Sequence, residues 1–133
     1  MNTPSSQPDD RPDVSVIVVN YNTADLLERM FAALEASRGS LRLQVIVVDN
    51  ASRDNSVDIL RKRHPDAQLI ENKVNVGFGR ANNQALPHVR GRYVLLLNTD
   101  AFVAQDTLTK TVQFMDAHPR YGATNASVLS SST

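Results

Sequence analysis

The heptapeptide VSVIVVN at residues 14–20 is a run of β-branched side chains, interrupted by one serine, that ends in an asparagine. Such a nearly continuous apolar run is typical of a parallel strand that is buried on both faces of its sheet. Apolar residues then recur at helical spacing, which predicts a helix that begins after Asn22 or Thr23 and ends at Gly39. The chain therefore opens with a buried strand followed by a helix.

The same order of strand and helix repeats three times further along the chain. Strands are expected at residues 43–48, 67–70 and 93–97, and helices at about 57–64, 78–89 and 108–115. Pro87 is expected to shorten or kink the helix at 78–89, because proline lacks the N–H that a helix interior needs. Right-handed crossovers between parallel strands then give an α/β fold with a doubly wound, mostly parallel sheet.

Length, composition and charge narrow the class of protein. The 133 residues suffice for one domain, and 41% hydrophobic with 21% charged residues is ordinary for a globular protein. A formal net charge of zero gives no long-range attraction to nucleic acid, so no nucleic-acid partner is expected. The sequence contains no cysteine, which excludes disulfides, thiolate zinc sites and cysteine nucleophiles. Its longest apolar runs have the length of strands, so no transmembrane segment is expected.

The single domain is expected to occupy residues 14–123. Residues 1–13 are polar and contain prolines but no apolar stretch, which predicts a disordered lead-in and not a secretory signal. Residues 124–133 are rich in serine and too polar to build another buried layer, which predicts a flexible tail.

Amide and carboxylate side chains directly follow three of the predicted strands. Asn20-Tyr21-Asn22 follows the first strand, Asp49-Asn50 the second and Asn98-Thr99-Asp100 the last. Because the carboxyl ends of parallel strands meet at one edge of a sheet, one ligand-binding cleft would hold all three groups. Any one of them could instead simply start a turn or cap a helix. Three such groups together favour a binding site.

Two of these carboxylates suggest specific chemistry. Asp49 follows an apolar strand, where a carboxylate is costly unless it accepts hydrogen bonds or opens into a cleft. It can accept an N–H from a base such as uracil or thymine, or cap the next loop. Asp100, with Asn98 two residues earlier, offers oxygen ligands to a divalent cation whose shell a diphosphate would complete. The alternative for Asp100 is a turn-forming role.

A glycine-containing segment, Asn75 to Arg80, precedes the third predicted helix. Its glycines let the backbone approach a ligand closely, and a helix N-terminus favours anions. Gly77 and Gly79 do not form a dinucleotide fingerprint, because a third glycine is missing and the segment does not follow the first strand. The pattern therefore disfavours a nicotinamide enzyme.

Four segments together resemble family 2 glycosyltransferases of the Rossmann-like GT-A fold, especially bacterial rhamnosyltransferase-like members. The segments are residues 14–22, 47–56, 75–85 and 95–100. The resemblance implies a nucleotide-binding set, with Asp49 on the base, that comprises Asn20, Tyr21, Asn22, Asp49, Asn75, Gly77, Asn83, Asn98 and Thr99. Asp100 is the implied ligand of Mg²⁺ or Mn²⁺, because the family often carries Asp-x-Asp where this chain has Asn98-Thr99-Asp100.

The resemblance also implies an activity. It implies an inverting, metal-assisted transfer of a sugar from a nucleoside diphosphate-sugar, dTDP- or UDP-linked, to a hydroxyl of a glycan or lipid-linked acceptor in cell-surface polysaccharide synthesis. Such a role suits a cytoplasmic location or a peripheral one at the inner face of the plasma membrane. Family members are longer, which implies that this chain is truncated before the acceptor-binding half. The catalytic residues stay unknown, with the general base expected beyond residue 133.

Two other interpretations compete with this one. A donor-binding module without transferase activity predicts the same nucleotide binding but no turnover. A receiver-like phosphorylation domain also places acidic residues at the ends of parallel strands, but here residues 20–22 supply no acidic partners after the first strand. The receiver interpretation therefore ranks below the other two.

Overall fold

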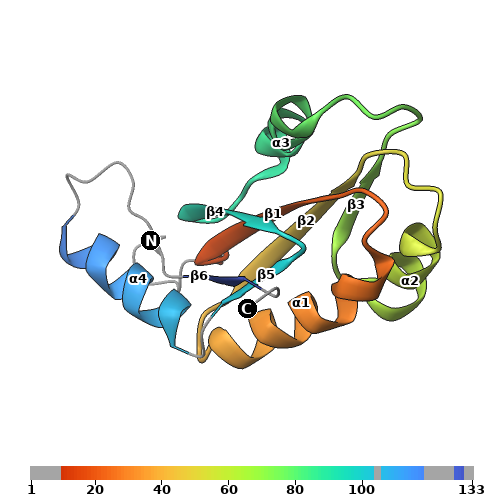
Figure 1. Ribbon diagram of the computed structural model, residues 1–133. Coiled ribbons are helices and arrows are strands. Elements are labelled where there is room, and N and C mark those ends of the chain that lie inside the picture. Colours follow the sequence, from red (N-terminus) through yellow and green to blue (C-terminus); the bar gives the residue numbers. More distant parts are fainter. Residues whose placement is uncertain (1–9, 104–105, 119–127, 131–133) are drawn as a thin grey trace.

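The computed structural model describes residues 10–103, 106–118 and 128–130, and its central sheet lies between helices (Figure 1). The main elements are β1 (Val14–Asn20), α1 (Ala24–Ser37), β2 (Leu43–Asp49), α2 (Ser56–Arg63), β3 (Gln68–Glu71), α3 (Phe78–Ala85), β4 (Tyr93–Asn98) and α4 (Thr107–Ala117). The shorter elements are the 3-10 turn η2 (Leu86–His88) and the strands β5 (Ala101–Val103) and β6 (Val128–Ser130).

The central sheet has four parallel strands in the order β3-β2-β1-β4, and β5 and β6 form a separate antiparallel pair. In the pairing of β1 with β2, Asn20 lies opposite Asp49. On the other side of β1, Val19 lies opposite Asn98 at the end of β4. The predicted α/β fold with a mostly parallel sheet is therefore confirmed, and the polar strand ends share one edge.

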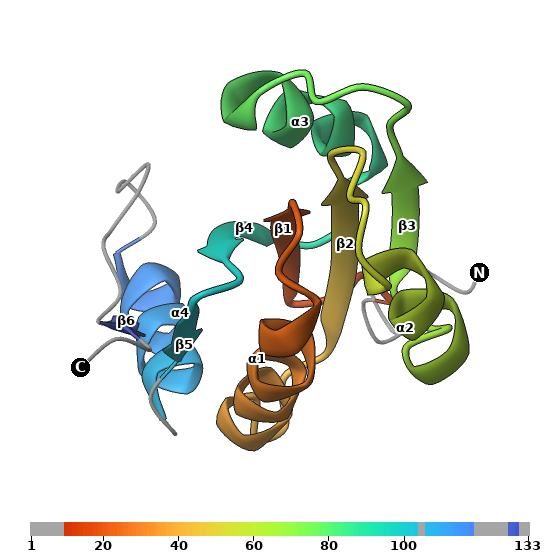
Figure 2. The same ribbon diagram turned by 45° about the vertical axis from the view of Figure 1, so that its right-hand side comes forward.

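Helices cover both faces of this sheet (Figure 2). Val14, Val16 and Val18 point to the face that packs against α1, α2 and α4. Ile17 points to the opposite face, where β2 residues and Ala81 of α3 complete a second apolar cluster. Burying a Val or Ile side chain contributes about 1.5–3 kcal/mol, so this two-sided burial makes β1 the centre of the fold. In the part of the chain that the structure describes, no helix is long and apolar enough to cross a membrane.

The third helix ends where the sequence predicts an interruption. The α-helix α3 stops at Ala85, and Pro87 lies in the 3-10 turn η2 that follows it. A proline inside a longer α-helix would remove one backbone hydrogen bond and clash with the preceding turn, so the chain tightens there. The chain then runs through Val89, which is extended, towards β4.

Both ends of the domain differ in part from the prediction. Residues 12 and 13 lie in the lead-in that was expected to be disordered, yet Arg92 N–H donates to Pro12 O at 3.1 Å and Asp13 N–H donates to Arg42 O at 2.8 Å. In the predicted flexible tail, β6 pairs with β5. A three-residue strand is too short to show a hydrophobic period, so it could not be predicted from the sequence. The rest of the lead-in and of the tail lies outside the described residues.

A buried polar pair fixes the connection from α3 to β4. Ser15 Oγ of β1 donates to Gln44 Oε1 of β2 at 2.6 Å. Gln44 Nε2 donates to the carbonyl of His88 at 2.8 Å, and the backbone N–H of Gly91 donates to Ser15 Oγ at 2.8 Å. Both buried polar side chains are therefore satisfied, and they hold the loop before β4 close to β1.

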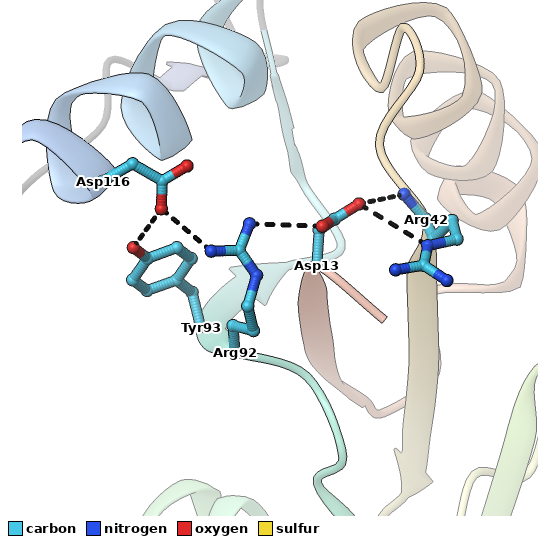
Figure 3. Close-up of polar contacts among 5 residues, drawn as sticks. All are labelled: Asp13, Arg42, Arg92, Tyr93 and Asp116. Atoms are coloured by element: carbon cyan, nitrogen blue, oxygen red, sulfur yellow. Dashed lines mark hydrogen bonds and ion pairs between the residues drawn. The ribbon is translucent and has the colours of Figure 1, made fainter. Parts of the chain in front are cut away.

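A network of charged side chains joins the start of the sheet to α4 (Figure 3). Arg92 lies between two carboxylates, 3.2 Å from Asp13 Oδ1 and 2.9 Å from Asp116 Oδ1. Asp13 also accepts the backbone N–H of Arg42 at 2.8 Å, and Asp116 accepts the Tyr93 hydroxyl at 2.6 Å. The backbone N–H of Arg42, together with Arg92, lowers the pKa of Asp13, and the Tyr93 hydroxyl and then Arg92 lower that of Asp116.

We expect the substitution Arg92→Met to reduce the free energy of unfolding by about 1 kcal/mol at pH 7, since exposed ion pairs contribute little each. The folded-state pKa values of both carboxyls lie below their unfolded values. Their contribution is therefore present above the unfolded pKa of about 3.9 and is lost as pH falls through the folded values. Urea unfolding should show a smaller difference between variant and wild type at pH 2.5 than at pH 7.

The exposed Lys62 on α2 provides the control, Lys62→Met, which should leave the pH dependence unchanged. An Arg92→Met effect that stays constant from pH 7 to pH 2.5 would show that the lost stability comes from packing and not from the carboxylates.

Candidate functional site

A cleft of about 510 Å³ opens where β1, β2 and β3 end. The loop after β1 contributes Tyr21, and the loop after β2 contributes the range 51–53. The loop after β3 contributes the range 72–75. This is the edge at which the sequence predicts a ligand site, because open parallel sheets bind ligands beyond their carboxyl ends.

Asp49 lies beneath the cleft and is only 1% exposed. Its Oδ1 accepts hydrogen bonds from Asn20 Nδ2 at 2.8 Å and from Ser52 Oγ at 2.7 Å. Its Oδ2 accepts the backbone N–H of Ser52 at 2.9 Å. These bonds compensate for burial of the carboxylate and hold Ser52, a residue that lines the cleft, in one position.

The loops after β1 and β2 are tied to each other through Asn22. Its backbone N–H donates to Ser52 Oγ at 2.9 Å, and its side-chain oxygen accepts the backbone N–H of Arg53 at 2.7 Å. Asn22 and Ala51 have φ angles of 54° and 68°. Asparagine enters this left-handed region readily, whereas for alanine it costs roughly 1–2 kcal/mol. The network of hydrogen bonds therefore imposes the shape of this wall.

Asn50 ties the third loop to the same framework. Its side-chain oxygen accepts the backbone N–H of Val76 at 3.0 Å, and its Nδ2 donates to the carbonyl of Gly77 at 3.2 Å. Gly77 has a φ of 88°, a conformation that suits glycine. Asn50 was expected at this edge of the sheet without a role of its own; it is 3% exposed and fixes the loop that carries Asn75 into the cleft.

The predicted residues of the glycine-containing segment divide between two positions. Asn75 lines the cleft, and its side-chain oxygen accepts the N–H of Gly77 at 2.8 Å. Gly77 is the N-cap residue directly before α3, and Asn83 is exposed on that helix. Neither of them lines the cleft. Ala81 packs against the sheet with no exposure.

Hydrogen bonds between side chains run across the sheet edge from β2 to β4. Asn20, which donates to Asp49, accepts the hydroxyl of Thr23. Thr23 Oγ1 lies 2.9 Å from Thr99 Oγ1, and because Thr23 uses its hydrogen on Asn20, Thr99 is the donor. The predicted residues Asn20, Asp49 and Thr99 are therefore joined in one chain of bonds.

Asn98 and Asp100 flank Thr99 and are both exposed. Strands lie about 4.8 Å apart, so the end of β4 is about 10 Å from that of β2. Within the described residues no three His, Asp or Glu side chains gather as a metal site. Asp100 and Asn98, two residues apart, supply a carboxylate and an amide oxygen, a partial set of hard ligands of the kind that Mg²⁺ or Mn²⁺ completes with substrate phosphate.

Six further residues line the cleft and were not predicted: Ala51, Ser52, Arg53, Asn72, Lys73 and Val74. Ser52 and Arg53 belong to the segment 47–56 that carries the resemblance, so their place in that segment could have indicated that they lie at the site. Lys73 lies in a loop without any period, and only the folded arrangement brings it next to the β2 loop.

Comparison with known proteins agrees with this geometry. The family model described as glycosyl transferase family 2 matches residues 15–130. Succinoglycan biosynthesis protein ExoO of Rhizobium meliloti is 33% identical over 118 residues, which are 88% of this chain and 33% of that protein.

Solved structures match as well. Mannosyltransferase PcManGT from Pyrobaculum calidifontis, solved in complex with GDP-Man and Mn²⁺, superposes with a TM-score of 0.69 at 34% identity, covering 84% of this chain and 36% of that one. S. aureus TarS 1-349 in complex with UDP-GlcNAc superposes with a TM-score of 0.72 at 26% identity over 80% of this chain and 32% of that one. The chain thus spans about a third of the length of each of these three proteins.

Proposed function

Because the chain belongs to glycosyl transferase family 2, we propose that its cleft binds the nucleoside diphosphate part of a sugar donor for transfer to an acceptor hydroxyl. The observation that carries the proposal is the position of the cleft, at the carboxyl ends of three parallel strands. The complexes of PcManGT with GDP-Man and of TarS with UDP-GlcNAc support a nucleotide sugar as the ligand.

The base is proposed to lie between the loops of β1, β2 and β3. Tyr21 is 47% exposed at the cleft and offers a ring on which a base can stack. Asp49 Oδ2 accepts one hydrogen bond, so it keeps an acceptor position for a base N–H. The nucleoside would then contact a wall that is already ordered by Asn20, Asn22 and Asn75, which lowers the entropy lost on binding.

The diphosphate is proposed to extend towards β4. The distance of about 10 Å between the ends of β2 and β4 is comparable with the length of a nucleoside diphosphate. Asp100 and Asn98 would hold Mg²⁺ or Mn²⁺ there, with Thr99 hydrogen-bonded back to the β1 loop. A divalent cation supplies charge neutralisation for the departing nucleoside diphosphate. The Mn²⁺ in the PcManGT complex supports this choice of cofactor.

The wider activity rests on the same resemblance. We propose an inverting reaction with a dTDP- or UDP-sugar, of rhamnosyl type or related, and a glycan or lipid-linked acceptor of cell-surface polysaccharide synthesis. The role of ExoO in succinoglycan biosynthesis supports this class of product. The general base that deprotonates the acceptor is proposed to lie outside residues 1–133, and the location to be cytoplasmic or peripheral at the inner face of the plasma membrane.

A donor-binding module without turnover is the second candidate, because the chain covers only about a third of the length of ExoO and of PcManGT. Release of sugar from UDP- or dTDP-sugars by the purified chain, measured above the rate without protein, would exclude it. Nucleotide binding without such release would favour it.

We expect Asp100→Ala to remove most of the gain in nucleotide affinity that Mn²⁺ provides. Loss of a group that supports a metal costs roughly 10–100-fold in metal affinity, and loss of a ligand should cost no less. Calorimetric titration of UDP with and without Mn²⁺ measures the gain. The exposed Asp58 on α2 supplies the control, Asp58→Ala, which should bind like wild type. Equal gains in Asp100→Ala and wild type would place the metal elsewhere.

A further inference from the structure

Three of the side-chain oxygens that line the cleft accept hydrogen bonds from within the protein. Ser52 Oγ donates to Asp49 and accepts from Asn22 N–H and Asn20 Nδ2, at 2.7, 2.9 and 3.2 Å. The side-chain oxygen of Asn72 accepts from Gln84 at 2.9 Å. Because the oxygen of Asn75 accepts the N–H of Gly77, its amide nitrogen is the free end. The side-chain oxygens of Ser52, Asn72 and Asn75 are thus already engaged.

Two cations face the same cleft. Arg53 comes from the loop after β2 and Lys73 from the loop after β3, and both are exposed. The backbone N–H of Arg53 is bonded to Asn22, but within residues 10–103, 106–118 and 128–130 neither cationic group has an ion-pair or hydrogen-bond partner. Guanidinium and ammonium groups donate hydrogen bonds and accept none. Together with the Asn75 amide nitrogen, they make the outer part of the cleft a surface of donors.

We propose that Arg53 and Lys73 select the base of the donor by hydrogen-bonding its exocyclic carbonyl oxygens. The preferred bases are then keto bases, with uracil or thymine favoured over cytosine. The inference rests on the proposed function, since it assumes that the nucleoside occupies this cleft.

The chemistry of position 4 of the pyrimidine separates these bases. Uracil and thymine carry a carbonyl oxygen there, whereas cytosine carries an amino group that donates. A cation that faces the carbonyl at position 4 forms a charge-assisted hydrogen bond with it. The amino group of cytosine offers the same cation no acceptor at that position. Phosphate is the other acceptor that cations could meet, but the proposed diphosphate site lies about 10 Å away beyond β4.

The test compares UDP with CDP, which differ in the base alone. Calorimetry would measure both dissociation constants for wild type, Arg53→Met, Lys73→Met and the double variant, with Lys62→Met as the control at an exposed cation on α2. Methionine keeps the length of the aliphatic stem and removes the donors. The readout is the ratio of the two constants, which a general loss of affinity does not change.

Wild type should bind UDP at least tenfold more tightly than CDP, with about tenfold from one charge-assisted hydrogen bond of the cations and the rest from Asp49, which faces an N–H that cytosine lacks. The double variant should lower that ratio about tenfold, while Lys62→Met should keep it. An unchanged ratio in the double variant would overturn the inference, as would an equal weakening of UDP and CDP that is smaller for UMP, since the cations would then bind phosphate. In both results the cleft still binds nucleotide, whereas no binding by folded wild type would overturn the proposed function itself.

Discussion

Asp49→Ala is expected to lower the free energy of unfolding by about 3 kcal/mol and to weaken nucleotide binding on the order of 100-fold. The substitution removes the acceptor of both Ser52 donors and one of the two acceptors of Asn20 Nδ2, which keeps its bond to Ser52 Oγ. Unsatisfied buried donors cost about 1–3 kcal/mol each, and water that enters from the cleft would offset part of this. Affinity falls further because the loops after β1 and β2 lose the group that orders them.

Urea unfolding and calorimetric titration with UDP measure the two effects. Asp49→Asn keeps the volume but places an amide against the Ser52 donors, so it should lie between wild type and alanine. Asp58→Ala, at an exposed carboxylate of α2, should match wild type in both measurements. Wild-type affinity in a folded Asp49→Ala protein would mean that the cleft needs neither the carboxylate nor the loop order it provides.

Gly91→Ala should lower the free energy of unfolding by about 3 kcal/mol, which is the upper end of the usual cost of adding a methyl group to a well-packed core. A Cβ atom at Gly91 would lie 2.6 Å from the backbone nitrogen of Ser15 and 2.9 Å from the carbonyl carbon of Val14. Those atoms belong to the central strand β1 and cannot shift without disturbing its pairing with β2 and β4. The same Cβ would lie 2.7 Å from Ser15 Oγ, which holds Gly91 N–H.

The matched control is Gly79→Ala. Nothing lies within 4 Å of a Cβ built at Gly79, which is exposed inside α3, so alanine should raise stability by up to about 1 kcal/mol through its higher helix propensity. Urea midpoints of the two variants should therefore move in opposite directions. Equal midpoints would show that β1 yields to the added methyl group.

The arrangement of the sheet could be predicted because burial on both faces of β1 leaves a pattern in the sequence itself. The partner of its one serine could not: Ser15 meets Gln44 only through the parallel register of β1 and β2. The short strands β5 and β6 were missed because three residues show no period. Pro87 acted locally, through its own ring, so its effect on α3 was predicted correctly.

In the site, too, some features follow from the local sequence and others depend on the tertiary fold. Asn20, Asp49 and Thr99 follow strand ends, and the parallel register joins them as expected from their positions. Asp49 is buried under Ser52, and Arg53 and Lys73 line the same cleft, because of the way the loops fold over the strand ends. Loops carry no periodic signal in the sequence, so neither feature could be predicted. The roles of these residues towards a nucleotide remain proposals that the variants above address.

The central claim is that the cleft beyond β1, β2 and β3 binds a nucleoside diphosphate next to a divalent cation. Calorimetric titration of the wild-type chain with UDP, dTDP and GDP, each with and without Mn²⁺, tests it most directly. We expect saturable binding of at least one of the three, strengthened by Mn²⁺. Folded protein that binds none of them, with or without the metal, would contradict it.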